Sequence, residues 1–593
     1  MEPSDNLRAG RRILEGIEGY ELIEDLIWDY TAKHWSFKFK LIGEYTETEY
    51  VPIETEWYCF LSDDYPYGKL EIYPSSTRGL SATFPHMLYN RNISKPWRTG
   101  NICVKTHYGI WGESFFNTEP FDISRIEWAI HRSKAWLMAA AENRLFSEGD
   151  PFEFPDMPTK KLPTVGFLET EENLTSFWNK TTLKNGIVRI KKFQNNDRII
   201  AVLGFKEKNT LITYDWGHEV EGFKDEKALS EGLWYLLPKI PVLPPWQIPE
   251  TWEELFSCCQ AMGVDLEQWI HHQLIERKLF NRVTKLLLGF PVSDYIGSQP
   301  TRLHWFCLDL FKNDIKLNGF RDNSRELYVI KVKIELNPIK KIQWMLTENL
   351  ANDQLTTRGN VSLDLQSKNN LIIGCGAIGS QITELLVRLG CTRLTLVDND
   401  TFSPGNAARH TLTFNSTNLF KSEELAKRLN SIFPTCKIEF VKQEFMQIVY
   451  SKPDFLEPFD LVMDLTAEDD VFKDIIYNIS GKEKIFISLS MGLNASRLFC
   501  YMDKTPKEET FSYFKSELSP WLKKQKEENP DVNFQLEGIG CWHPVFPARL
   551  DDIIGLLAPV IRITENFLQS DLDRQFVVIE RQENGETKIS RNE

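Results

Sequence analysis

The chain has 593 residues, 42% of them hydrophobic and 12% aromatic, and a formal net charge of −15. This composition is typical of globular proteins and excludes a predominantly disordered chain, while the length indicates several domains. The negative charge argues against a general nucleic-acid or anionic-membrane binder.

The N-terminal sequence and the cysteines indicate a cytoplasmic protein. Residues 1–19 are charged throughout and lack the apolar core of a signal peptide. No window of the sequence approaches the roughly 20 apolar residues of a membrane span. The ten cysteines are scattered and contain no C-x-x-C pair. That pattern suits free thiols in a reducing compartment and offers no tetrathiolate zinc site.

Residues 1–160 predict a small α+β domain. A helical pattern near residues 8–30 precedes three strand-like runs, which are separated by turns rich in Pro, Gly and Asp. The strand-like runs are residues 35–42, 56–61 and 69–73. A second helical pattern over residues 124–146 closes the domain.

The middle of the chain predicts a mixed domain without a chemical motif. Residues 151–163 are rich in proline and polar residues, which indicates a linker. Residues 161–345 then mix strand patterns with a helix-like pattern over residues 266–288. At the far end of the chain, residues 576–593 are expected as a tail with a strand pair around Asn584.

At Asn370 the pattern changes to strand, loop, helix and strand. Residues 371–373 form an apolar strand-like run, residues 381–389 a helical run and residues 393–397 a second strand-like run. Alternation of this kind predicts a Rossmann-like, doubly wound parallel sheet over residues 346–575.

A glycine motif lies between the first of these strands and its helix. Gly374, Gly376 and Gly379 form the pattern G-x-G-x-x-G. Glycines let the backbone approach a phosphate closely, and the helix N-terminus supplies N–H donors. Asp398 ends the second strand, where a carboxylate accepts hydrogen bonds from a ribose. Taken alone, this motif fits NAD as well as ATP.

Four polar residues after Asp398 separate these two ligands. They are Asp400, Asn406, Arg409 and Lys421. An NAD site needs no pair of cations, whereas cleavage of a triphosphate does, because negative charge builds on the leaving pyrophosphate. Arg409 can hold phosphate in a bidentate way, and Lys421 acts as a mobile point charge. The pattern therefore favours ATP.

Residues 350–570 resemble the adenylation domain of the ubiquitin-activating enzyme superfamily, which includes the sulfur-carrier adenylyltransferases. The resemblance rests on the glycine motif, on residues 397–400 and on the spacing from Asn406 through Arg409 to Lys421. It implies that Asp398 binds the ribose of ATP and that the arginine and the lysine bind its phosphates.

The resemblance also implies a magnesium ion, but the ligand differs. The family's Thr-Asp-Asn, whose aspartate holds magnesium, stands here as Thr466-Ala467-Glu468. Asp464 or Glu468 would have to take over. We expect Asp464 to hold Mg2+, because it ends an apolar strand run at the edge of the sheet that faces the ligand crevice. Arg358 is a candidate for the arginine that some members place in the partner subunit's site.

Cys541 is the first candidate for a reactive thiol. Small residues precede it and prolines follow it, which indicates an exposed loop, with His543 and Arg549 near enough to assist a thiolate. The charged stretch before it, residues 504–529, is of the kind that forms a mobile crossing segment. In activating enzymes of the ubiquitin type, a cysteine in this region takes the adenylated carboxylate as a thioester.

Cys103 is the second candidate. Its surroundings resemble the ubiquitin-conjugating enzyme pattern in four places: Asp64-Tyr65-Pro66, Pro85-His86, Gly100-x-Ile102-Cys103, and Trp111 eight positions after the cysteine. The resemblance implies that Cys103 carries a thioester. The family's His-Pro-Asn tripeptide is absent, so that His86 and Asn92 are the candidates for its oxyanion role.

A conjugating-type half followed by a linker and an activating-type half resembles the bacterial activating–conjugating fusion proteins of the antiphage system CBASS. This resemblance implies a homodimer formed through the adenylation domain. It also implies that a cGAS-like nucleotidyltransferase is activated at its C-terminal carboxylate, passed from Cys541 to Cys103 and joined to a lysine of a target protein. No membrane or nucleic acid is expected as a partner.

Two other functions remain open at this point. A sulfur-carrier adenylyltransferase would not need the conjugating-like half, and many such enzymes carry a zinc tetracysteine that this sequence lacks. A non-catalytic nucleotide-sensing scaffold is supported only by the altered Thr466-Ala467-Glu468.

Overall fold

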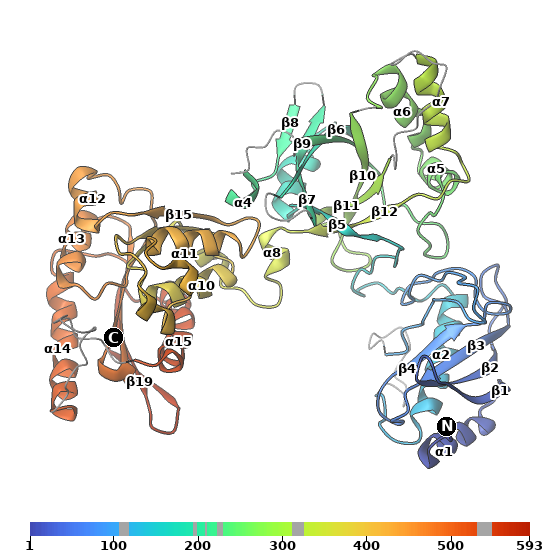
Figure 1. Ribbon diagram of the computed structural model, residues 1–593, viewed down its shortest axis with the longest axis horizontal. Helices are drawn as coiled ribbons and strands as arrows, with labels where there is room; N and C mark the ends of the chain where they lie inside the picture. Colours follow the sequence, from blue (N-terminus) through green and yellow to red (C-terminus); the bar gives the residue numbers. More distant parts are fainter. Residues whose placement is uncertain are drawn as a thin grey trace. The chain divides into compact units, whose positions relative to one another are not determined.

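The structure is a computed structural model that describes residues 1–105, 118–193, 198–207, 210–221, 229–280, 282–310, 325–530 and 548–592. The chain forms two compact units (Figure 1). The N-terminal unit comprises Met1–Lys192, Asn196–Tyr214 and Lys227–Asn349, and the C-terminal unit comprises Phe193–Asn195, Asp215–Glu226 and Leu350–Glu593. In the described part of the chain, no helix is both long and apolar enough to cross a membrane.

The N-terminal unit begins with an antiparallel four-stranded sheet in the order β1-β2-β3-β4. Its strands are β1 (Tyr20–Asp29), β2 (His34–Ile42), β3 (Glu54–Leu61) and β4 (Leu70–Pro74). The helices are α1 (Asp5–Ile13) and α2 (Arg125–Ala141). The three predicted strands and the second predicted helix are therefore confirmed. α2 buries Ile130 and Trp136 in one core with Phe39 and Trp57 of the sheet.

The helix predicted near residues 8–30 is wrong in its second half. α1 ends at Ile13, a 3-10 turn (Leu14–Gly16) follows, and β1 begins at Tyr20. Gly19 adopts a φ of +71°, a conformation that glycine reaches without strain, and its carbonyl oxygen accepts the N–H of Ile42 at 2.8 Å. The helical segment ends before this turn, and β1, which pairs with β2, begins directly after it.

The rest of the N-terminal unit is built around a barrel. The sheet order is β5-β12-β11-β10-β9-β6-β7-β8, and a further pairing of β5 with β7 closes it. The strands are β5 (Lys160–Phe167), β6 (Asn185–Lys192), β7 (Ile199–Glu207), β8 (Thr210–Thr213), β9 (Leu229–Leu236), β10 (Val283–Val292), β11 (Arg302–Asp309) and β12 (Trp344–Asn349). The helices are α3 (Glu171–Asn173), α5 (Trp252–Ala261), α6 (Leu266–His271) and α7 (Arg325–Glu335). The helix predicted over residues 266–288 is thus wrong beyond α6 and its π-helical extension (His272–Glu276), because β10 begins at Val283.

A buried carboxylate lies inside this barrel. Glu169 is fully buried and accepts hydrogen bonds from Trp178 at 3.0 Å, from Trp305 at 2.9 Å and from the hydroxyl of Tyr214. Burial raises the pKa of Glu169 to about 7, although these three donors lower it. The barrel core is therefore held in part by an ionisable group.

The C-terminal unit is a single eight-stranded sheet with helices on both faces. The strand order is β15-β14-β13-β16-β17-β18-β19-β20. The strands are β13 (Asn370–Ile373), β14 (Arg393–Val397), β15 (Lys437–Val441), β16 (Leu461–Asp464), β17 (Ile485–Met491), β18 (Arg497–Asp503), β19 (Arg574–Arg581) and β20 (Thr587–Asn592). The helices are α4 (His218–Glu221), α8 (Asn352–Leu355), α9 (Leu363–Ser367), α10 (Ala377–Arg388), α11 (Lys421–Asn430), α12 (Phe445–Ser451), α13 (Asp469–Ile479), α14 (Thr510–Glu528) and α15 (Leu550–Gln569).

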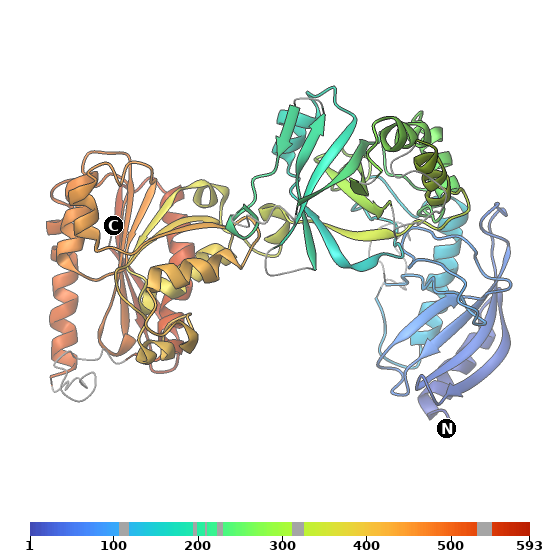
Figure 2. The same ribbon diagram turned by 45° about the horizontal axis from the view of Figure 1, so that its top comes forward.

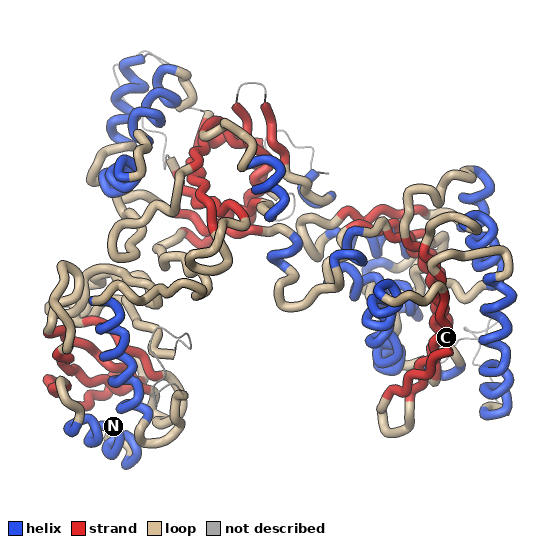
Figure 3. Tube along the Cα trace, turned by 180° about the vertical axis from the view of Figure 1, so that it is seen from behind, coloured by secondary structure: helices blue, strands red, loops and turns tan. Residues whose placement is uncertain are grey.

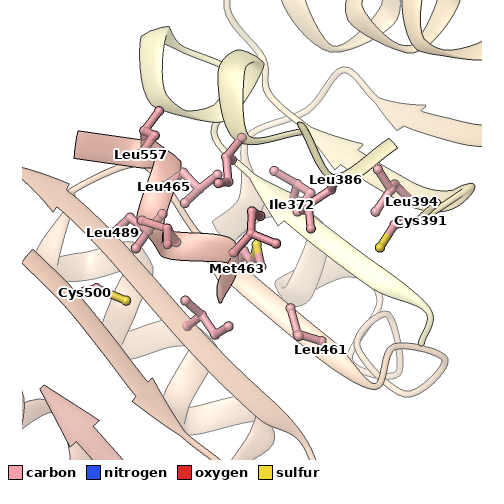
Figure 4. Close-up of a cluster of buried hydrophobic side chains, with 14 of the residues drawn as sticks. Ile372, Leu386, Cys391, Leu394, Leu461, Met463, Leu465, Leu489, Cys500 and Leu557 are labelled. Atoms are coloured by element: carbon pink, nitrogen blue, oxygen red, sulfur yellow. The ribbon is translucent and has the colours of Figure 1, made fainter. Parts of the chain in front are cut away.

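The helices on both faces of this sheet confirm the predicted doubly wound fold. α10, α11 and α15 cover one face of the sheet, and α12, α13 and α14 cover the other (Figures 1 and 2). Figure 3 shows the same strands between the two layers of helices from behind. One core packs Ile372, Leu394 and Met463 of the sheet against Leu386 and Leu557 of the first layer (Figure 4).

The strand order positions a ligand crevice. The first five strands, β15 to β17 in the order above, pair in parallel, and β13 lies between β14 and β16. The chain therefore leaves β13 toward one side and later returns on the other, which makes a switch point between β13 and β16. In open α/β sheets, ligands bind at such a point beyond the carboxyl ends of the strands.

Two expectations about the end of the chain need correction. Residues 504–529, expected as a mobile crossing segment, contain the regular helix α14, which buries Phe514 and Leu518 against the sheet. Glu528 near its end forms a bidentate ion pair with Arg497 of β18 at 2.6 and 2.9 Å. The strand pair around Asn584 is present as β19 and β20, and both extend the sheet instead of forming a separate tail.

Candidate active site

The three glycines of the loop after β13 have different roles. A Cβ added to Gly374, whose φ is +92°, would lie 3.0 Å from the backbone carbon of Leu465. A Cβ added to Gly379 would lie 2.0 Å from the carbonyl oxygen of Gly374. A Cβ added to Gly376 would meet nothing within 4 Å. The outer two glycines are thus required by packing, whereas Gly376 leaves open space for a ligand.

The same loop opens a helix whose first N–H groups can bind an anion. Gly376 is the N-cap of α10, and no side chain caps this helix end. The unpaired N–H groups and the helix dipole favour a phosphate there.

Asp398 lies directly beside the glycine loop. Its carboxylate accepts the N–H of Cys375 at 2.6 Å and the N–H of Asp400 at 2.8 Å. Burial raises the pKa of Asp398 above its ordinary value, while these two hydrogen bonds lower it. Each carboxylate oxygen keeps a second acceptor position, so that the side chain can still accept a ribose hydroxyl.

Two cations border the space in front of the loop. Lys421 is the first residue of α11, an unfavourable place for a positive charge near a helix N-terminus, and its Nζ lies 2.9 Å from Asp400. Arg409 follows a short 3-10 helix (Pro404–Ala408) that is fixed by a hydrogen bond from the N–H of Ser403 to Asn406 at 3.0 Å. A bound polyphosphate could accept hydrogen bonds from both cations.

The crevice consists of two lobes that meet at the glycine loop. The first lobe, of about 370 Å³, is bordered by Gly374, Asp398 and Asp400, as expected for a nucleotide. The second lobe, of about 290 Å³, contains Asn406 and Arg409. Its apolar lining residues include Ile378, Met491, Ala548 and Ile553. The residues common to both lobes are Gly376, Lys421, Leu465 and Thr466.

The structure therefore brings together the nucleotide-site residues named from the sequence. Gly374, Asp398 and Asp400 line the first lobe, Asn406 and Arg409 line the second, and Gly376 and Lys421 line both. Gly379 supports the loop from behind.

His410 is a site residue that the sequence analysis missed. It is 6% exposed and lines the second lobe. Its Nδ1 accepts the N–H of Leu412 at 3.0 Å, so that Nε2 carries the proton and donates to the carbonyl oxygen of Cys375 at 2.6 Å. Burial lowers the pKa of His410 to about 4. A single histidine outside any motif gave no signal in the sequence.

The magnesium assignment to Asp464 does not fit the structure. Asp464 ends β16 as expected, but its carboxylate is 1% exposed and lines neither lobe. It accepts hydrogen bonds from the N–H and hydroxyl of Thr466, at 3.1 and 2.7 Å, and from the hydroxyl of Ser488 at 3.3 Å. Burial raises the pKa of Asp464 to about 6. Glu468, the other carboxylate considered, is exposed and lines the first lobe.

No preformed metal cage accompanies either carboxylate: within the described ranges, no group of three or more His, Cys, Asp or Glu side chains could hold a metal ion. A magnesium ion bound through one carboxylate and substrate phosphates needs no such cage.

Cys103 is the exposed thiol among the cysteines that the structure describes; the other eight are buried, and none forms a disulfide. Ile102 and Val104 on either side of it are buried, so that the sulfur points outward. The buried Arg132 lies beneath this stretch and donates to the carbonyl oxygen of Val104 at 2.9 Å. Burial lowers the pKa of Arg132, and the neighbouring Cys103 raises it.

The two oxyanion candidates have other side-chain contacts. The ring of His86 contacts Leu145 and Glu153 instead. Asn92 is exposed and accepts the N–H of Ser94 at 3.0 Å. Both assignments stay predictions.

Other predicted residues are only partly covered. Cys541, His543 and Trp111 lie outside the described residues. Arg549 is fully exposed and forms an ion pair with Asp551 at 2.6 Å. Arg358 is exposed in the loop between α8 and α9 and lines neither lobe of its own chain.

Comparison with known proteins agrees with this architecture. Residues 143–350 match the model of the Cap2 central linker domain, and residues 350–541 match the ThiF family. The chain is similar to the ATP-dependent ubiquitin transferase-like protein Cap2 of Enterobacter hormaechei, with 33% identity over 89% of this chain and 88% of that protein. It is also similar to the Cap2 protein of Escherichia coli, with 35% identity over 20% of each chain.

Among solved structures, MccB of E. coli crystallised with AMPCPP and MccA is 14% identical, with a TM-score of 0.27 over 46% of this chain and 72% of that chain. The assignment rests instead on the long match to the Enterobacter protein and on the two domain matches. The chain belongs to the Cap2 family of ATP-dependent ubiquitin transferase-like proteins, with a ThiF-type adenylation domain in its C-terminal half.

Proposed function

We propose that this enzyme uses ATP to activate the C-terminal carboxylate of a partner protein and then conjugates that partner through two of its own cysteines. The carboxylate attacks the α-phosphate of ATP, which gives an acyl-adenylate and pyrophosphate. Cys541 displaces AMP and forms a thioester. Cys103 takes the acyl group from Cys541, and the amine of a target lysine finally displaces the Cys103 thiolate to form an amide.

The two-lobed crevice is the observation that carries this proposal. An adenylation site must hold a nucleotide and an acyl donor so that they meet at the α-phosphate. The first lobe carries the ribose-binding carboxylate of Asp398, and the second carries Arg409 beside apolar walls. Lys421 and Gly376 border both lobes, at the place where the triphosphate is cleaved in this proposal. Glu468 is the carboxylate that would hold a magnesium ion on these phosphates.

The thioester steps are supported by two further observations. Ala548 lines the second lobe, and Cys541 precedes it by seven residues, a length of chain that spans at most about 25 Å. Cys103 presents an exposed sulfur on a separate α+β domain. An acyl group activated in the second lobe could therefore pass to Cys541 and then to Cys103.

The proposed partners rest on the resemblance to the CBASS fusion proteins. We propose a cGAS-like nucleotidyltransferase as the activated protein, a lysine of another protein as the acceptor, and a role in antiphage defence, as for CBASS proteins. We also propose a homodimer formed through the adenylation domain. Arg358 is a candidate for completing the site of the other subunit, since it is exposed and lines neither lobe of its own chain.

Pyrophosphate exchange tests the first step. With the nucleotidyltransferase as partner, the enzyme should exchange labelled pyrophosphate into ATP, and Lys421→Ala should slow this exchange by about 100-fold or more. Lys427→Ala is the matched control, because Lys427 lies on the same helix, is 59% exposed and pairs with Glu424 outside the crevice. We expect the control to remain within about twofold of the parent. Equal exchange with a partner whose C-terminal carboxylate has been amidated would refute the proposal.

A further inference from the structure

The backbone beside Cys103 is formed by the segment Thr83–Tyr89. The N–H of Cys103 donates to the carbonyl oxygen of His86 at 2.8 Å, and the N–H of Leu88 donates to Asn101 at 3.0 Å. Met87 and Ile102 form the antiparallel bridge between these two bonds. The position of the thiol is thus tied directly to the backbone of His86.

This segment is held by the central linker region, residues 143–350. Besides the contact of the His86 ring with Leu145, four polar contacts connect this segment to the linker region. They are the ion pair of His86 with Glu153 at 2.6 Å, the bond from Tyr89 N–H to Asp156 at 2.9 Å, the bond from Thr83 N–H to Gln247 at 3.0 Å, and the bond from Trp246 N–H to the Thr83 carbonyl at 3.2 Å. The side chain of Tyr89 is itself part of the hydrophobic core of the linker region.

His86 is the member of this segment with the most constrained position. Its φ is +57°, a left-handed conformation that costs a non-glycine residue on the order of 1 kcal/mol and persists only when neighbours hold it. Its ring is 9% exposed, with Nε2 at 3.0 Å from the Leu145 carbonyl oxygen and Nδ1 against the Glu153 carboxylate. Both polar contacts of the ring come from the linker region, and neither comes from the four-stranded sheet β1–β4.

We propose that Glu153 is a positioning residue for Cys103, and this inference rests on the proposed thioester transfer to that cysteine. Glu153 holds the ring of His86, and the backbone carbonyl of His86 holds the Cys103 N–H. The linker region thereby sets where the sulfur stands when it attacks the thioester on Cys541. The linker region therefore affects the rate of the transfer step, in addition to connecting the two catalytic halves.

Geometry of this kind affects rate more than affinity. Thioester exchange requires the attacking sulfur within about 3.5 Å of the carbonyl carbon and on the correct trajectory, and a displacement of about 1 Å can cost up to 100-fold in rate. Loss of the Glu153 contact removes one of the two polar partners of the His86 ring. The left-handed backbone at His86 can then relax and carry the Cys103 N–H with it.

The test measures the two cysteines separately in the full-length enzyme. Loading of Cys541 and the single-turnover transfer to Cys103 are followed by mass spectrometry with ATP and the nucleotidyltransferase. Glu153→Ala should leave loading of Cys541 unchanged and slow the transfer by about tenfold. Glu153→Gln should restore most of the rate, because a carboxamide can either donate to or accept from Nδ1 of His86.

A matched control separates positioning from general stability. Glu231→Ala removes a carboxylate from another ion pair of the same linker region, with Arg282 at 2.7 Å, and should leave the transfer rate unchanged. If Glu153→Ala does not fold, Asp156→Ala, which releases the Tyr89 N–H at the other end of the segment, takes its place with the same expectation.

Two outcomes would overturn the inference: a normal transfer rate in Glu153→Ala, or an equal loss of Cys541 loading and transfer. Failure of the proposed function is recognised independently. In that case Cys103→Ala would conjugate as well as the parent enzyme, whatever the Glu153 variants do.

Discussion

The Nε2 atom of His410 lies 2.6 Å from the carbonyl oxygen of Cys375, in the middle of the glycine loop. The donated proton is fixed there because Nδ1 accepts the N–H of Leu412. A neutral imidazole thus holds the loop whose N–H groups face the expected phosphate. We predict that His410 positions this loop for the nucleotide.

His410→Ala leaves the buried Cys375 carbonyl without this donor, so that the loop loses a fixed position. We expect the KM for ATP in pyrophosphate exchange to rise by about tenfold, a loss of roughly 1.4 kcal/mol that is typical of a buried hydrogen bond. An unchanged KM would show that the loop is held by other contacts.

His410 also predicts a dependence of stability on pH. Because its folded pKa, about 4, lies below the ordinary value of 6.5, the unfolded chain binds the proton first as pH falls. Stability is fully present above about pH 6.5 and is lost toward pH 4, by up to about 3 kcal/mol. Thermal melts of the parent and of His410→Ala between pH 7 and pH 5 should show a smaller acid loss in the variant.

The glycine loop allows a direct separation of packing from ligand binding. Gly379→Ala places a methyl group 2.0 Å from the Gly374 carbonyl oxygen and should destabilise the C-terminal unit by about 1–3 kcal/mol. Gly376→Ala meets no atom within 4 Å, and the φ of −77° at Gly376 suits alanine. We expect Gly376→Ala to melt like the parent but to bind ATP at least about tenfold more weakly, because its methyl group occupies the space of a phosphate. Normal ATP binding by this variant would place the nucleotide elsewhere.

The magnesium requirement can be assigned with three variants. Asp464→Asn keeps an oxygen that can accept both hydrogen bonds from Thr466. The magnesium concentration that gives half-maximal pyrophosphate exchange should therefore stay unchanged in this variant. Glu468→Gln should raise that concentration several-fold, about fivefold, because a carboxamide is a weaker ligand. Ala467→Asp restores the family's aspartate at a φ of +60°, which aspartate tolerates better than most residues, and should lower the concentration. A raised requirement in Asp464→Asn alone would return the role to Asp464.

The barrel of the linker region should lose stability as pH rises. The folded pKa of Glu169, about 7, lies above its ordinary value of 4.5. The stability that its proton contributes is fully present below about pH 4.5 and is lost as pH rises through 7, on the order of 3 kcal/mol. The melting temperature of this part of the chain should fall between pH 5 and pH 8, and Glu169→Gln should remove that dependence. An equal slope in the variant would assign the titration to another group.

The grouping of the residues named for the nucleotide site could be predicted because their signal is local. The glycine motif and Asp398 directly follow β13 and β14, Arg409 follows a 3-10 helix, and Lys421 begins α11. The sheet order then brings them together. Asp464 was placed correctly at a strand end, but the sequence could not show that its side chain turns toward Thr466 and Ser488. Hydrogen bonds of this kind depend on tertiary packing.

Contacts between distant segments were beyond sequence reasoning for the same reason. The composition of residues 151–163 predicts a linker. In the structure, however, Glu153 contacts the side chain of His86, which lies 67 positions earlier in the chain. In the C-terminal unit, Gly217 donates its N–H to the Pro434 carbonyl at 2.8 Å, and a Cβ there would lie 2.2 Å from Cys436. Neither pairing follows from the periodicity of its own segment.

The order of thioester loading tests the central claim most directly. The parent enzyme, Cys541→Ala and Cys103→Ala are each incubated with ATP and the nucleotidyltransferase, and trapped adducts are located by mass spectrometry. We predict that Cys103→Ala accumulates a thiol-sensitive adduct at Cys541, and that Cys541→Ala still exchanges pyrophosphate but loads neither cysteine. Loading of Cys103 in the Cys541→Ala protein would contradict the relay.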